Sequence, residues 1–138
     1  MKVIGFNFSK ISAERTKAFS EKVKIDSKIN IKDLSEVNPS AVKFKEELIN
    51  VSFLYGLDYN PNIAKILFEG NIVLALESKE SKEILKEWKD KKMSDEFKLK
   101  LFNQILNKCN LKALQLEDEL NIPPHFKLPS LHLDSSKE

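Results

Sequence analysis

The sequence predicts an α+β protein whose first half forms antiparallel strands and whose second half forms helices. Two observations carry this prediction. Through the first half, apolar residues fall on every second position, which is the period of a half-buried strand. At Ser78 the period changes to the three- and four-residue spacing of an amphipathic helix. With 138 residues, the chain has the length of one domain that can bury its own core.

The two clearest strands are predicted over 49–59 and 64–76. The first alternates six apolar residues with Asn50, Ser52, Leu54, Gly56 and Asp58. The second continues the same period after a turn at Asn60-Pro61-Asn62, a composition typical of hairpin turns. The alternating positions of the two strands are Ile49, Val51, Phe53, Tyr55, Leu57 and Tyr59, then Ala64, Ile66, Phe68, Gly70, Ile72, Leu74 and Leu76. Short connections of this kind favour antiparallel pairing.

The earlier strands carry weaker signals. Ile4, Phe6 and Phe8 predict one strand, with at best a short second strand near 11–13. Over residues 23–31 the apolar Val23, Ile25, Ile29 and Ile31 lie opposite polar residues and predict another strand. Residues 33–40 are expected to form a connection that ends in an Asn38-Pro39 turn.

The second half predicts a short charged helix and a longer apolar-faced one. Ser78 is the expected N-cap of the first, and Ser94, followed by two acidic residues, is the expected N-cap of the second. Its apolar stripe runs from Phe97 to Cys109, where Asn110 is a possible interruption before a continuation toward Pro123-Pro124. Beyond this point we expect an extended tail, with residues 134–138 disordered.

Charge and composition exclude several classes of protein. The 23 basic and 21 acidic side chains leave a net charge of +2, and 22 of the cations are lysines. Nucleic-acid binding is disfavoured because the guanidinium fork that reads phosphate and guanine is present only at Arg15. The sequence has no apolar run long enough for a membrane span and no signal-peptide pattern, which predicts a cytoplasmic protein.

No set of residues indicates catalysis. The single Cys109 lies on the apolar helix face and is expected to behave as a small hydrophobic residue. The two histidines, His125 and His132, are expected to be surface residues of the tail, and the neighbouring acids Glu117, Asp118 and Glu119 are not spaced as a catalytic pair. We therefore predict no enzyme, no metal site and no cofactor.

The order of the elements resembles the SecB export-chaperone family. The residues that carry the resemblance are the strands 23–26, 49–59 and 66–72 and the ending Phe126-Lys127-Leu128-Pro129-Ser130-Leu131-His132-Leu133. Together they cover roughly residues 10–133. The resemblance implies a single domain over 1–133 with helices packed on one side of a four-stranded sheet. It also implies an ATP-independent holdase for unfolded or nascent polypeptides, linked to protein export and assembled as a dimer of dimers.

One departure from the family concerns charge. The export chaperones are acidic and use that charge to dock on a translocase motor, whereas this chain carries a net charge of +2. The helical segment 79–93 is also more charged than the family's crossover region. This segment suits the wider SecB-like group, which includes archaeal homologues and chaperones of toxin–antitoxin systems.

A holdase needs partly exposed apolar surface that accepts extended segments. The predicted client-binding residues are Tyr59, Trp88, Phe126, Leu128 and Leu131, because each adjoins a charged or irregular segment. Core packing is the competing interpretation for Tyr59 and Trp88, and it is preferred for the mid-element aromatics Phe53, Phe68 and Phe102. Two other functions stay open: a non-enzymatic scaffold that binds one fixed partner, and a nucleic-acid-associated protein that uses the Lys-rich residues 1–45.

Overall fold

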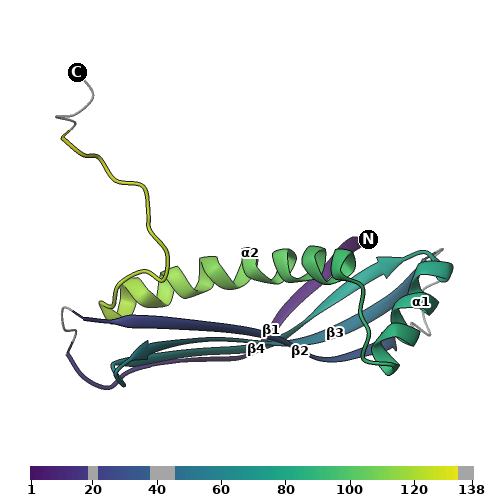
Figure 1. The fold of residues 1–138 in the computed structure, drawn as a ribbon, viewed down its shortest axis with the longest axis horizontal. Coiled ribbons are helices and arrows are strands. Elements are labelled where there is room, and N and C mark those ends of the chain that lie inside the picture. The colour runs from purple at the N-terminus through teal and green to yellow at the C-terminus, as the bar shows by residue number, and fades with distance from the viewer. Residues whose placement is uncertain (19–21, 38–45, 134–138) are drawn as a thin grey trace.

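The computed structural model describes residues 1–18, 22–37 and 46–133. The elements are β1 (Lys2–Arg15), β2 (Lys24–Val37), β3 (Glu47–Asn60), β4 (Ala64–Leu76), α1 (Ser78–Lys89) and α2 (Asp95–Leu120). The strands form one antiparallel sheet in the order β1-β4-β3-β2. Helix α2 lies along one face of this sheet, and α1 lies near one end (Figure 1). The predicted α+β class and four-stranded sheet are confirmed; the predictions for 134–138 and for the Asn38-Pro39 turn concern residues outside those described.

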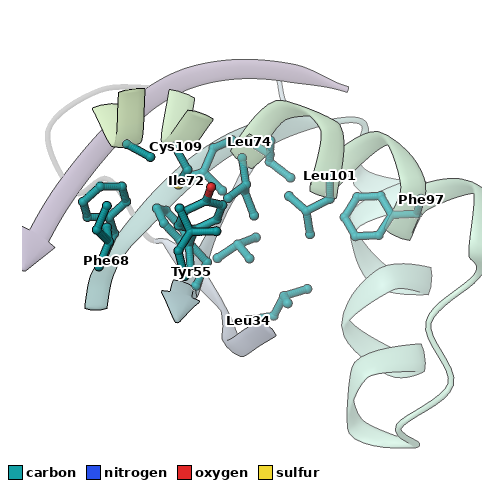
Figure 2. Close-up of a cluster of buried hydrophobic side chains, with 14 of the residues drawn as sticks. Leu34, Tyr55, Phe68, Ile72, Leu74, Phe97, Leu101 and Cys109 are labelled. Atoms are coloured by element: carbon teal, nitrogen blue, oxygen red, sulfur yellow. The ribbon is translucent and has the colours of Figure 1, made fainter. Parts of the chain in front are cut away.

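The core lies between the sheet and the two helices. Every second residue of β3 and β4 is buried on this side, as their alternation predicts, and α2 contributes one buried residue at every fourth position. Figure 2 shows Leu101 and Cys109 reaching from α2 toward Leu74 and Ile72. Ile84 of α1 belongs to the same cluster. Both helices therefore cover the same face of the sheet.

The middle of the core is an aromatic cluster built around Gly70. The rings of Phe6, Phe8 and Phe53 lie within 6.4 Å of one another, and Phe68 stacks on Tyr55 at 5.6 Å. A Cβ atom on Gly70 would collide with the backbone oxygen of Asn7 and lie 2.8 Å from the Phe53 ring. The strand therefore requires glycine here because neighbouring groups approach its Cα closely.

Strands β1 and β2 are longer than their sequence patterns predict, because each contains β-bulges. Bulges near Ile4 and Ser9 make residues 2–15 one strand and leave Ile4, which was expected on the core face, 44% exposed. A bulge after Ile31 changes which positions face the core, so that Leu34 is buried within the predicted connection. Each bulge inserts one residue and reverses the alternation that predicted the strand.

The helices differ from prediction at two residues. Ser78 was predicted as the N-cap of α1, but the helix begins at Ser78 and Glu77 occupies the N-cap position. The Ser78 hydroxyl instead donates a hydrogen bond to Glu47 Oε1 at 2.8 Å. Helix α2 passes through Asn110 without interruption. Its N-cap is confirmed, since the Ser94 hydroxyl accepts a hydrogen bond from the backbone N–H of Phe97 at 3.3 Å. It ends at Asn121, which takes the left-handed conformation common at helix ends.

Candidate functional site

A groove lies where the end of α1, the start of α2 and strand β2 meet. Its apolar lining consists of Ile31, Trp88, Met93 and Phe102, and its polar lining consists of Asn30, Lys89, Lys91 and Lys98. Its volume is about 610 Å³, within the range of small-ligand and peptide side-chain pockets. The apolar side chains are half-buried. This groove, which we call the Trp88 groove, contains one of the predicted client-binding residues.

The turn between the helices shapes the groove. At the end of α1 the N–H of Lys91 donates to Trp88 O at 3.0 Å, and the N–H of Lys92 donates to Glu87 O at 2.7 Å, the pattern of a Schellman motif. The Glu87 carboxylate also accepts a hydrogen bond from the N–H of Ser94 at 2.9 Å. These bonds fix the chain between the two helices and place Met93 in the lining.

The groove borders a side of α2 that the sheet leaves partly uncovered. The backbone of α2 approaches β1 and β4, and Tyr55 and Tyr59 of β3 reach it through their side chains. On the β2 side of the sheet, the core-facing isoleucines are only half-buried. Several α2 residues that come one position after a buried residue of the helix are half-buried as well. These residues are Ile25, Ile29 and Ile31 of β2, and Phe102, Leu106, Asn110 and Leu114 of α2. Half-covered apolar surface therefore extends along this side of α2.

The tail is anchored beside α2 by a buried polar network. His125 lies between two α2 side chains: its Nδ1 is 2.8 Å from Glu117 Oε2, and its Nε2 is 2.9 Å from Asn110 Oδ1. The Tyr55 hydroxyl donates to the same Asn110 oxygen at 3.1 Å. His125, expected at the surface, is thus half-buried and fixes the beginning of the tail.

Tyr59 belongs to this network and does not match the prediction that it contacts clients. Its side chain has no exposed surface, and its hydroxyl donates to Glu117 Oε2 at 2.6 Å, with Pro123 O as a second acceptor at 2.6 Å. Burial and the nearby carboxylate raise the pKa of its phenol. Tyr59 is a core residue that holds the sheet, α2 and the tail together.

The other predicted residues lie in the tail and are exposed. The Phe126 ring packs edge-on against His125 with centroids 4.8 Å apart, and 43% of the residue is exposed. Leu128 is 45% exposed, and Leu131 and Leu133 are almost fully exposed. The tail extends away from the sheet and helices (Figure 1). The structure thus places Trp88 in a groove and Phe126, Leu128 and Leu131 on a separate exposed segment.

Sequence reasoning missed Phe102, Met93 and the three groove lysines. Phe102 was assigned to the core because it adjoins the apolar stripe of α2. The buried residues of α2, however, include 97, 101, 105 and 109, which are four positions apart. Phe102 falls one position after Leu101 and therefore lies beside this buried row, not in it. Met93 carried no signal of its own, because its position depends on the turn geometry.

The single cysteine is buried in the core. Burial raises the pKa of the Cys109 thiol to about 12, which keeps it protonated and unreactive at neutral pH. Among the described residues there is no group of three or more His, Cys, Asp or Glu that could hold a metal ion. Neither helix in the described part of the chain is long and apolar enough to cross a membrane.

Comparison with known proteins identifies the fold. No protein-family model matches the chain, and a comparison with curated proteins finds no match. Among solved structures, the chain is similar to the SecB-like chaperone Rv1957 of Mycobacterium tuberculosis, determined in complex with a ChAD peptide from the Rv1956 HigA1 antitoxin. The TM-score is 0.56 at 12% sequence identity, over 96% of this chain and 91% of the other. The chain therefore has the SecB-like chaperone fold that its sequence resemblance predicts.

Proposed function

We propose that this protein is an ATP-independent holdase that binds extended segments of unfolded polypeptides in the Trp88 groove. The observation that carries the proposal is the half-buried apolar lining formed by Ile31, Trp88, Met93 and Phe102. An aromatic pair with a methionine accepts side chains of different shapes, because the thioether is flexible and polarisable. The structural neighbour Rv1957 was determined in complex with a ChAD peptide from the Rv1956 HigA1 antitoxin, which supports polypeptide as the ligand.

The tail supplies a second proposed contact. Phe126, Leu128 and Leu131 expose apolar surface on a segment whose beginning is fixed by His125. On α2, Asn110, which contacts His125, lies eight residues after Phe102, a rise of about 12 Å. An extended client of about four residues spans this distance. One client segment can therefore contact both the groove and the root of the tail.

We further propose that the protein assembles as a homo-oligomer, a dimer of dimers. It acts in the cytoplasm and has no enzymatic activity. Strands β1 and β2 form the two edges of the sheet, and Ile4 and Ile11 of β1 are 44% and 46% exposed. An edge strand with exposed apolar residues is a ready surface for pairing with a second copy. Light scattering after size exclusion should give about four times 15.9 kDa, whereas a monomer would contradict this part of the proposal. The link to protein export stays a prediction.

Aggregation assays test the holdase function. At stoichiometric ratios and without ATP, the protein should suppress aggregation of at least two unrelated unfolded clients. A scaffold dedicated to one partner would protect neither of them. Trp88→Ala and Met93→Ser should weaken protection, while Leu111→Ser should not, because Leu111 is 68% exposed on α2 and does not line the groove.

Stability measurements control for unfolding of the variants. Trp88 packs partly against the core, so Trp88→Ala costs some stability. Met93→Ser tests the same groove from the turn between the helices. If both variants protect clients as well as the wild type does, the groove is not the binding site.

A further inference from the structure

Three lysines surround the apolar lining of the Trp88 groove. Lys89 ends α1, Lys91 lies in the turn and Lys98 lies in the first turns of α2, and none of the lining residues is acidic. We propose that the groove selects polypeptide segments in which an apolar side chain is flanked by Asp or Glu. The inference rests on the proposed polypeptide-binding function and specifies its substrate class.

The charges of these lysines are not neutralised by ion pairs within the described chain. The ion pairs of the described residues involve Lys24, Lys32, Lys100 and His125. Lys89, Lys91 and Lys98 form none, and all three are exposed. Their ammonium groups are therefore available to a ligand, while their methylene stems extend the apolar surface.

Lys91 occupies a backbone position that favours glycine. Its φ is +57°, in the left-handed region, directly after the C-cap Asp90. Most Schellman motifs carry glycine there, because a side chain at positive φ costs conformational energy. A lysine at this position is a local cost to folding, and it adds a positive charge to the groove. This combination indicates a role for the side chain in binding.

The same features favour an acidic polypeptide over a nucleic acid. The apolar lining includes the aliphatic Ile31 and Met93 as well as two aromatic rings, and the groove contains no arginine. The single arginine, Arg15, donates hydrogen bonds to the backbone oxygens of Leu120 and Asn121 at the opposite end of α2. The net charge of the chain is only +2, without the large excess of cations typical of proteins that track a phosphate backbone.

The test compares three fluorescent peptides that share one apolar core and carry Asp, Gln or Lys on both flanks. Fluorescence anisotropy with the full-length protein at low salt should show the Asp peptide binding about fivefold tighter than the Gln peptide, with the Lys peptide weakest. The preference should shrink at 0.5 M salt because mobile ions screen exposed charges. A single-stranded oligonucleotide serves as the fourth ligand.

Variants of Lys91 and Lys98 separate binding from stability. Lys91→Gly should raise the melting temperature by about 3 °C while reducing the preference for the Asp peptide. A merely structural Lys91 would give the first effect without the second. Lys98→Gln should also reduce the preference, and Lys108→Gln is its matched control, an exposed lysine on the same helix that does not line the groove.

The outcomes distinguish this inference from the proposed function. Equal binding of the three peptides would overturn the charge selection and leave the holdase function standing. Tighter binding of the oligonucleotide than of any peptide would assign the lysines to nucleic acid and overturn the inference. If no peptide binds and no client is protected, the proposed function itself fails.

Discussion

The hydroxyl of Tyr59 on β3 donates a 2.6 Å hydrogen bond to Glu117 on α2, joining residues 58 positions apart in the buried interior. His125 contacts the same carboxylate oxygen from the tail. The other oxygen of Glu117 has no partner among the described residues. The position of α2 on the sheet, and with it the uncovered side that forms the Trp88 groove, therefore depends on this polar contact as well as on apolar packing.

Tyr59→Phe tests this contact. Removing the hydroxyl takes one of two partners from a buried carboxylate, and we expect the free energy of unfolding to fall by about 2 kcal/mol. Tyr55→Phe is the comparison within the same network and should cost about 1 kcal/mol, because the Tyr55 hydroxyl contacts the neutral Asn110 amide at 3.1 Å and His125 Nε2 at 3.3 Å but not the Glu117 carboxylate. Urea denaturation followed by circular dichroism measures both. A Tyr59→Phe variant as stable as the wild type would contradict the network's structural role.

Gly70→Ala should destabilise the sheet, because the new methyl group would overlap the Asn7 backbone oxygen and the Phe53 ring. Overpacking of this kind costs about 1–3 kcal/mol. Gly5→Ala provides the comparison, since its Cβ would meet only Val73 at 3.7 Å, an ordinary contact. Thermal denaturation should show a clear loss for the first variant and little change for the second. Equal effects would mean that the close approach at Gly70 is not restrictive.

Cys109 should be inert in the native protein. It is fully buried, and its pKa of about 12 leaves almost no thiolate between pH 7 and 8. A thiol-specific chromogenic reagent should leave the folded protein unmodified and label one thiol per chain in denaturant. Rapid labelling without denaturant would show that α2 separates from the sheet under native conditions.

The tail should contribute to client binding and not to stability. Leu131 is fully exposed, so Leu131→Ser should change the free energy of unfolding by less than about 0.5 kcal/mol. If clients cover this side chain, their affinity should fall about fivefold, the effect of losing about 1 kcal/mol of apolar burial. Leu111→Ser, another exposed leucine, is the control for both measurements. Unchanged client affinity would remove Leu131 from the binding surface.

The sequence predicted most accurately where one periodicity runs unbroken. Strands β3 and β4 keep strict alternation and were located almost to the residue, whereas the bulges at Ser9 and Lys32 hid the full lengths of β1 and β2. After a bulge, the residues that follow it face the opposite side of the sheet. The alternation of apolar residues then breaks, and the break looks like the end of the strand.

The site was predicted less completely, because it depends on tertiary packing. Trp88 was predicted from its charged surroundings and lies in the groove, where client binding stays a prediction. Tyr59 carried the same signal but is buried and hydrogen-bonded to Glu117, which no local pattern pairs with it. Phe102 was assigned to the core and instead lines the groove. Its partial exposure depends on how α2 packs on the sheet, which only the folded chain shows.

The most direct test of the central claim uses the two methionines as internal probes. Met93 lines the Trp88 groove, whereas Met1 lies outside it. With ¹³C-labelled methionine methyl groups, titration with an unfolded client should shift the Met93 signal, together with the indole signal of the single Trp88, and leave Met1 unchanged. Client binding that leaves both Met93 and Trp88 unperturbed would contradict the assignment of the groove as the polypeptide-binding site.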